Sequence, residues 1–183
     1  MQIAAVILAA GGSTRFGSPI QQARLGDRTM LESVVEIARE AGLNPVLAVV
    51  PPALAVPPDV VPVINDAPEE GVSRSLKMGI AALPTDVEAA IILLGDQPTL
   101  SVETIRAVLH ATSPERLVIA ARAGGLLAPP VLLMRDAFGL VEDASGDVGL
   151  APILAAHPEI VTPVEVGVHA PDVDRPADLE RLS

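Results

Sequence analysis

Apolar residues along the chain follow two spacings, which predict two kinds of secondary structure. Residues 3–8 (IAAVIL) and 89–94 (AAIILL) contain no polar side chain, shorter apolar runs cover 46–50, 60–64, 117–121 and 131–134, and a mostly apolar segment covers 160–166. Apolar runs of this length indicate strands, and a run without any polar residue indicates burial on both faces. The two six-residue runs, 3–8 and 89–94, are therefore predicted to be inner strands of a sheet.

Between the strands lie segments with the spacing of amphipathic helices. Within 30–41, Leu31, Val34, Val35 and Ala38 share one face, and Gly42 ends the segment. Further helical segments are predicted at 72–83, 101–111, 135–141, 150–156 and 176–182. Strands that alternate with helices predict an α/β fold with a mostly parallel, mixed sheet between two helical layers. We expect a single three-layer αβα domain over residues 1–183.

The loop after Leu8 is the first candidate site, because ligands bind beyond the carboxyl ends of the strands in such sheets. It reads LAAGGSTRFG over residues 8–17. Glycines let backbone N–H groups approach an anion, Ser13 and Thr14 add hydroxyl donors, and Arg15 adds a planar cation suited to phosphate oxygens. The alternative is an ordinary strand-to-helix loop with a surface arginine.

Carboxylates provide a second candidate site. Asp96 directly follows the apolar run 89–94 and one glycine, and Asp172 and Asp174 lie on the same side of a late extended segment. Mg²⁺ in proteins takes one or two carboxylates, with water and phosphate oxygens completing its shell. The alternatives are a turn residue for Asp96 and helix capping for the late acidic stretch, above all for Asp178.

Composition excludes several classes of function. The 183 residues carry 12 basic and 23 acidic side chains, a net charge of −11, which argues against broad binding to nucleic acid or to anionic membranes. With two Phe and no Trp or Tyr, the chain lacks platforms for base stacking, and without Cys it has no disulfides or thiolate metal sites. The first apolar run stops at Gly11 and follows no basic segment, so we expect no signal peptide, no membrane span and a cytoplasmic location.

Several collinear motifs together resemble one enzyme family. They are LAAGGSTRFG at 8–17, DRTML at 27–31, GVSRSLKMG at 71–79, LGDQP at 94–98, GDVG at 146–149 and DVDRPADL at 172–179. In this order they resemble the molybdenum-cofactor nucleotidyltransferases, the MobA/MocA-like branch with a Rossmann-like, GT-A-type fold. The LAAG and DQP forms are most similar to the cytidylyltransferase branch, which indicates CTP rather than GTP.

The resemblance implies a Mg²⁺-dependent transfer of a nucleoside monophosphate to molybdopterin, with release of pyrophosphate and a molybdoenzyme as a possible partner. It implies that Asp96 and Asp174 hold the metal and that Arg15 neutralises the leaving phosphates. It also implies that Ser73 and Ser75 contact the nucleotide or shape its pocket. The nucleotide-binding backbone would be that of Leu8, Ala9, Ala10, Gly11 and Gly12.

Two positions depart from the family pattern. Ile20 stands where the family has a phosphate-binding lysine, with Arg24 and Arg28 as possible substitutes, and Pro129 stands where a histidine is common. These departures leave two alternatives open: a non-catalytic nucleotide- or molybdopterin-binding protein, and a transferase with a sugar-phosphate acceptor. The role of Asp147 in GDVG also stays open between acceptor contact and capping of the next helix, with capping favoured.

Overall fold

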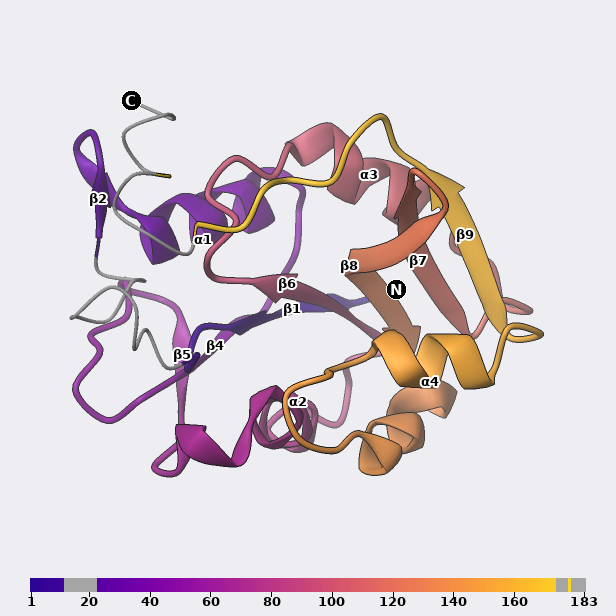
Figure 1. Cartoon of the computed structure of the whole chain (residues 1–183), viewed down its shortest axis with the longest axis horizontal. Coiled ribbons are helices and arrows are strands. Elements are labelled where there is room, and N and C mark those ends of the chain that lie inside the picture. The colour runs from indigo at the N-terminus through magenta and orange to yellow at the C-terminus, as the bar shows by residue number, and fades with distance from the viewer. Residues whose placement is uncertain (12–22, 174–177, 179–183) are drawn as a thin grey trace.

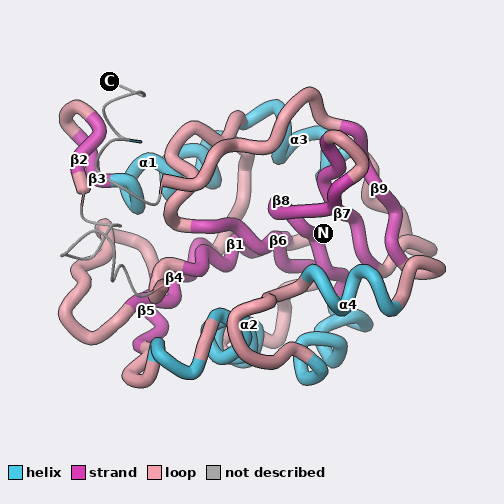
Figure 2. The backbone as a smooth tube through the Cα atoms, in the orientation of Figure 1, coloured by secondary structure: helices cyan, strands magenta, loops and turns pink. Residues whose placement is uncertain are grey.

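A computed structural model describes residues 1–11, 23–173 and 178, and its centre is a mixed seven-stranded sheet with strand order β5-β4-β1-β6-β8-β7-β9 (Figures 1 and 2). Neighbouring strands are parallel except for β8, which is antiparallel to both β6 and β7. The mostly parallel, mixed α/β sheet predicted from the sequence is confirmed. The strands are β1 (Ile3–Leu8), β4 (Val46–Val50), β5 (Val61–Ile64), β6 (Ala89–Leu94), β7 (Val118–Ala123), β8 (Leu126–Met134) and β9 (Val161–Glu165).

Helices cover both faces of the sheet (Figure 1). One face packs against α1 (Met30–Glu40) and α3 (Val102–His110), and the other against α2 (Val72–Ala81), the 3-10 segment η3 (Arg135–Asp143) and α4 (Ala151–Ala156). Alternate residues of the inner strands face opposite layers, so Ile7 and Ile91 join the α1–α3 core while Val6 and Ile92 join the α2–α4 core. Among the described residues, no helix is long and apolar enough to cross a membrane.

Local sequence explains where the helices begin. Thr29 caps α1 in a capping box with Glu32, whose carboxylate accepts from the backbone N–H of Thr29 at 2.6 Å. This hydrogen bond lowers the pKa of Glu32. Ser101 caps α3 by accepting from the N–H of Thr104 at 3.1 Å, as its position in the sequence predicts.

The region from residue 118 to residue 134 differs most from the predicted elements. Gly124 and Gly125 form a two-residue hairpin turn, and β8 begins at Leu126 rather than at Val131. Pro129 and Pro130, which cannot donate to a ladder, lie in a bulge where Ala120 pairs with Val131 and Ala121 pairs with Ala128. Strand β6 pairs with β8 only from Val131 onward.

Two further differences concern the residues around the site. A short hairpin missed by the sequence pattern, β2 (Arg24–Leu25) and β3 (Arg28–Thr29), precedes α1. Within the polar loop 65–71, residues Pro68–Glu70 form the 3-10 turn η2. The helix predicted for 176–182 lies outside the described residues except for Asp178.

Gly79 sets the close approach of α2 to the sheet. A Cβ at this position would lie 2.4 Å from Cγ1 of Val6, which is fully buried in β1. We predict that Gly79→Ala destabilises the protein by about 1–3 kcal/mol, because an added methyl group must displace a packed strand. Urea unfolding would measure this, with Gly139→Ala as the control, because nothing lies within 4 Å of a Cβ there.

Candidate active site

The candidate site lies where the carboxyl ends of β1 and β6 meet. Leu8 pairs with Leu94 at the end of both strands, and the backbone N–H of Gly95 donates to the carbonyl of Leu8 at 2.9 Å. A Cβ at Gly95 would lie 2.8 Å from Cβ of Ala9. The glycine of the LGDQP motif therefore lets the loop after β6, which carries Asp96, close against the loop after β1.

Two adjacent cavities open at this edge. The smaller one, of about 130 Å³, brings together five of the site residues predicted from the sequence: Leu8, Ala10, Gly11, Ser75 and Asp96. Its other lining residues are Pro68, Gly71, Val72, Leu94 and Asp147. Segments far apart in the chain thus share one polar hollow.

The remaining predicted nucleotide-binding residues lie elsewhere or beyond the described part of the chain. Ala9 is fully buried and donates its N–H to the carbonyl of Val49 at 2.9 Å, so it supports the loop from beneath. Ser73 lies on another side of α2, in a shallow hollow with Lys77 and Met78, away from the smaller cavity. Gly12, Arg15, Ile20 and Asp174 lie outside the described residues.

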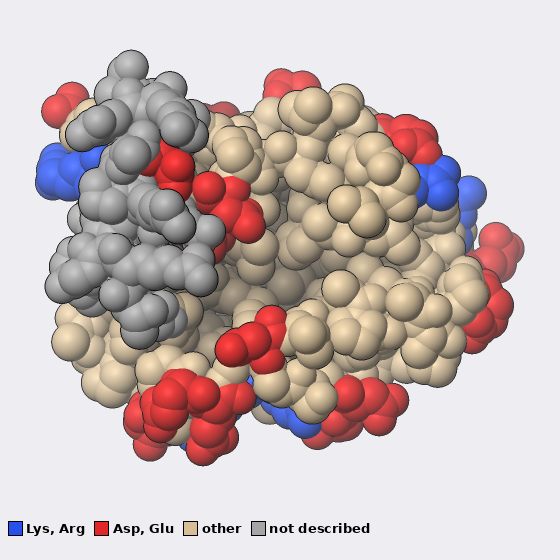
Figure 3. Space-filling model, in the orientation of Figure 1, with Lys and Arg blue, Asp and Glu red and all other residues tan. Residues whose placement is uncertain are grey.

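The larger cavity, of about 320 Å³, adjoins the smaller one, and Figure 3 shows the hollow at the centre of one face. Of the described residues, five line both cavities: Leu8, Val72, Leu94, Asp96 and Asp147. The rest of the larger cavity is lined by side chains of α2, β6, β8, α4 and the preceding loop, including Leu76, Ile92, Leu127, Pro129, Val131 and Leu154. Pro129 reaches this wall because β8 separates from β6 before Val131.

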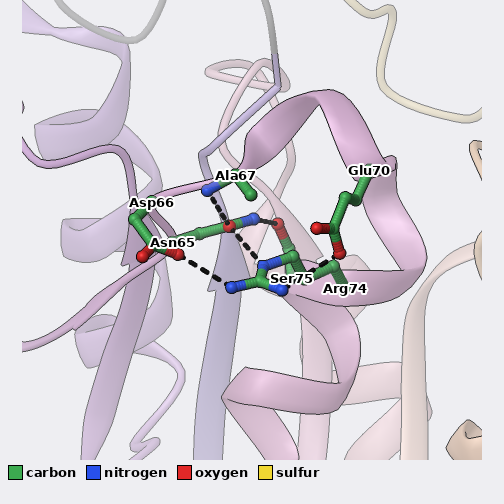
Figure 4. A network of polar contacts seen from close by, with 6 residues as sticks. All are labelled: Asn65, Asp66, Ala67, Glu70, Arg74 and Ser75. Atoms are coloured by element: carbon green, nitrogen blue, oxygen red, sulfur yellow. Dashed lines mark hydrogen bonds and ion pairs between the residues drawn. The ribbon is translucent and has the colours of Figure 1, made fainter.

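A buried asparagine organises the loop beside the smaller cavity (Figure 4). Asn65 is fully buried, and its Oδ1 accepts from the N–H of Ala67 at 3.1 Å and from Nε of Arg74 at 2.9 Å. Both of those partners are donors, so Oδ1 must face them, and Nδ2 donates to Oγ of Ser75 at 2.9 Å. Asn65 therefore orients the Ser75 hydroxyl, which lines the smaller cavity.

Arg74 connects Asn65 to two carboxylates at the surface end of the same network. Its guanidinium also binds Glu70 at 3.0 Å and Asp66 at 2.8 Å (Figure 4). The hydrogen bonds to Glu70 and Asp66 raise the pKa of Arg74. Its charge is therefore matched within the loop 65–71 and α2, which makes Arg74 a structural residue of this wall.

We predict that Asn65→Ala lowers the free energy of unfolding by about 2–4 kcal/mol, because one buried and two partly buried hydrogen bonds lose their partner. Urea denaturation would measure the change. Asp66→Asn is the control, because this side chain is 74% exposed and its ion pair with Arg74 should contribute under about 1 kcal/mol. Equal stability of Asn65→Ala and the parent chain would contradict this role.

Asp147 does not cap α4, so the favoured interpretation of this residue was wrong. Leu150 occupies the N-cap position without a side-chain hydrogen bond. The GDVG loop instead docks on the start of α2, where the N–H of Ser73 donates to the carbonyl of Gly146 at 3.0 Å. The space above Gly71 is filled by the backbone of Gly146 and by Oδ1 of Asp147, 2.5 and 2.9 Å from where a Cβ would lie.

The late acidic segment reaches the loop after β6. The N–H of Val173 donates to the carbonyl of Asp96 at 2.9 Å, and Nε2 of the buried Gln97 donates to Oδ1 of Asp172 at 2.7 Å. Among the described residues, no three His, Cys, Asp or Glu side chains form a metal-binding group. A single carboxylate beside a phosphate-sized cavity still fits a hard divalent cation, which takes most of its oxygen ligands from phosphate and water.

Arg24 and Arg28, the two cations near the position of the missing lysine, are engaged in local contacts. Arg24 donates to the carbonyl of Asp27 at 2.5 Å within the β2–β3 hairpin. Arg28 forms an ion pair with Glu36 of α1. Neither residue lines either of the two cavities.

Comparison with known proteins agrees with this fold. Residues 5–161 match the MobA-like NTP transferase domain, and the chain belongs to this family. The chain is also 33% identical over 114 residues to the bifunctional protein GlmU of Hyphomonas neptunium, covering 57% of this chain and 24% of that protein. The chain spans about a quarter of the length of the curated relatives it matches.

Solved structures extend the likeness over the whole chain. Rv0371c from Mycobacterium tuberculosis H37Rv is 26% identical with a TM-score of 0.86, over 100% of this chain and 97% of that one. A structure of Rv0371c in complex with manganese is 25% identical, with a TM-score of 0.82 over 100% and 98% of the two chains. The 2-C-methyl-D-erythritol 4-phosphate cytidylyltransferase of Thermus thermophilus, 19% identical, shares the fold, with a TM-score of 0.75 over 100% and 97%.

Proposed function

We propose that the protein transfers CMP from CTP to a phosphate-bearing acceptor, with molybdopterin as the first candidate, and releases pyrophosphate. The observation that carries this proposal is the smaller cavity, where the loop after β1 and Asp96 after β6 face one another. A glycine-containing loop that offers backbone N–H groups, with a carboxylate opposite, suits a nucleotide and its cation.

In the proposed complex, the backbone from Leu8 to Gly12 holds the nucleotide, and the Ser75 hydroxyl contacts it from α2. Asp96 and Asp174 hold a divalent cation, and Arg15 neutralises the departing phosphates. Mg²⁺ is the cation we propose, and the manganese complex of Rv0371c supports a divalent ion in this fold. When bound, the cation supplies charge neutralisation at the phosphates.

The reaction needs no protein nucleophile. An oxygen of the acceptor phosphate forms a bond to the α-phosphorus of CTP, the bond from that phosphorus to the β-bridging oxygen breaks, and pyrophosphate leaves. The protein contributes position and compensating charge, which dominate catalysis at phosphoryl centres. A molybdoenzyme that takes up the dinucleotide product is the proposed partner.

The choice of CTP rests on the LAAG and DQP forms of the two loops. The 2-C-methyl-D-erythritol 4-phosphate cytidylyltransferase from Thermus thermophilus has the same fold, which supports this choice. A turnover assay that follows pyrophosphate release from CTP and GTP, each with molybdopterin, would test it. We expect release with CTP; preferred release with GTP would overturn the base assignment.

A sugar-phosphate acceptor is the second candidate, favoured by the identity to part of GlmU. The same pyrophosphate assay, with a sugar 1-phosphate in place of molybdopterin and with each nucleoside triphosphate in turn, distinguishes the two. A non-catalytic binding role would leave both reactions without turnover while nucleotide binding persisted.

Ile20 provides a direct test of the phosphate site. We predict that Ile20→Lys tightens CTP binding by about tenfold or more, because a charge-assisted hydrogen bond to phosphate contributes about 1.5–3 kcal/mol. Isothermal calorimetry would measure it. Ile20→Gln, which adds length and polarity without charge, is the matched control and should give a much smaller gain.

A further inference from the structure

The larger cavity has an unusual distribution of polar groups for a transferase site. Among the described residues that line it, Asp96 and Asp147 are the only charged or polar side chains, and Lys, Arg and His are absent. Among these described residues a phosphate would find no cation, and a polyhydroxylated sugar would lose more hydrogen bonds to water than they could replace. The part of the acceptor that enters the cavity must therefore be largely apolar on its faces.

The two carboxylates lie on different elements around this cavity. Asp96 follows β6 at the boundary with the smaller cavity, where the reacting phosphates are proposed to bind. Asp147 belongs to the GDVG loop, is exposed to solvent, and has Oδ1 above Gly71 at the start of α2. With Asp96 assigned to the cation, Asp147 is the one described carboxylate in the lining that is left for the acceptor itself.

The GDVG loop is held in place by contacts that do not involve the Asp147 carboxylate. The N–H of Ser73 binds the carbonyl of Gly146, and the absence of a side chain at Gly71 lets the loop backbone approach α2. Asp147 does not cap α4. A fixed loop thus presents a carboxylate at the rim of an apolar cavity of about 320 Å³.

We propose that Asp147 determines acceptor specificity by binding the edge of a flat heterocycle that carries a ring N–H beside an exocyclic amino group, as a pterin does. A carboxylate matches this edge, because its two oxygens accept two parallel N–H bonds. The apolar walls from β6, β8 and α4 contact the ring faces. This inference rests on the proposed function, because it assigns the acceptor side of the same site.

Pterin and lumazine test the proposal as a pair of small probes. Lumazine has a carbonyl where pterin has the amino group. This carbonyl oxygen cannot donate a hydrogen bond to the carboxylate of Asp147 and repels it. Fluorescence titration of the full chain with Mg²⁺ should show pterin binding at least about tenfold tighter than lumazine, as expected for one charge-assisted hydrogen bond. The preference should fall below about twofold in Asp147→Asn, because the amide offers only one acceptor.

Asp143→Asn is the matched control, because Asp143 is an exposed carboxylate four residues earlier that lines neither cavity. It should keep the full preference for pterin. A role of Asp147 limited to folding would change thermal stability and not the ratio between the two probes. Equal binding of pterin and lumazine, an unchanged ratio in Asp147→Asn, or binding of neither probe would overturn the proposal.

A CTP titration on the same samples separates this inference from the proposed function. Retained CTP binding without a preference for pterin would overturn the role of Asp147 alone. Loss of CTP binding with the pterin preference intact would overturn nucleotidyl transfer and support the heterocycle site. If Asp147→Asn weakened CTP binding and left the pterin ratio unchanged, Asp147 would belong to the nucleotide.

Discussion

Replacing Asp96 by alanine is expected to lower turnover by about 100- to 1,000-fold and to remove the metal dependence of CTP binding. The carboxylate lies at the end of β6, between the two cavities, where the acceptor and the nucleotide are proposed to meet. Without it, the cation loses its ligand from the rigid edge of the sheet. Initial rates of pyrophosphate release with and without Mg²⁺ would measure the loss.

The controls for Asp96 separate charge from folding. Asp96→Asn keeps the volume and removes the charge, so it should lose most of the activity as well. Asp143→Ala removes an exposed carboxylate that lines neither cavity and should stay within about twofold of the parent chain. Full activity in a folded Asp96→Asn variant would show that this carboxylate does not hold the cation.

Gly71→Ala is expected to destabilise the protein by about 2–4 kcal/mol and to weaken CTP binding at the same time. Gly71 has φ 97° and ψ 172°, a conformation that residues with a Cβ rarely adopt. The new Cβ would also lie 2.5 Å from the carbonyl carbon of Gly146, which is backbone and cannot rotate away. The GDVG loop must then move, and both cavities lose part of their wall.

Urea unfolding and a CTP titration of the same variant would check both effects. Gly42→Ala is the control, because its φ is also positive, at 86°, but nothing lies within 4 Å of a Cβ there. Gly42→Ala should lower the free energy of unfolding by about 1 kcal/mol and leave CTP binding unchanged. Equal destabilisation by the two substitutions would mean that backbone conformation alone, and not the packing of the GDVG loop, explains the requirement for glycine.

Hydrophobic pattern and motif order were sufficient to predict the layered sheet, and they indicated the edge that carries the candidate site. The runs ending at Leu8 and Leu94 have no polar residues because both strands are covered on two faces, and this places their loops together. A run of apolar residues is visible in the local sequence, so these two strands could be predicted without knowledge of their partners. The rule that ligands bind beyond the carboxyl ends of strands indicated both loops, and the structure shows that Leu8 pairs with Leu94.

The sequence could not predict features that depend on contacts between distant segments. The bulge at Pro129 and Pro130 needs β7 beside it, and proline pairs by themselves indicate a loop. Asn65 looks like an ordinary loop residue until its burial and its bond to Ser75 are known. Ser73 and Ser75 match the motif equally well, but helical geometry directs only Ser75 into the smaller cavity.

Asp147 is a residue for which the local sequence pattern predicted the wrong role. An aspartate before a helix ordinarily predicts a cap, and the residues from Asp147 to Leu150 fit that pattern. The carboxylate lies over Gly71 instead, because the loop docks on α2, a helix far from it in the chain. The signal that could have found it was the pairing of two glycine motifs, GVSRS and GDVG, which the sequence alone does not connect.

A calorimetric titration of CTP, with and without Mg²⁺, tests the central claim most directly. The proposed site predicts binding that requires the divalent cation, that is lost in Asp96→Ala and that is stronger for CTP than for GTP. Binding of neither nucleotide up to millimolar concentration, in the parent chain and in Ile20→Lys alike, would contradict a nucleotidyltransferase site at the ends of β1 and β6.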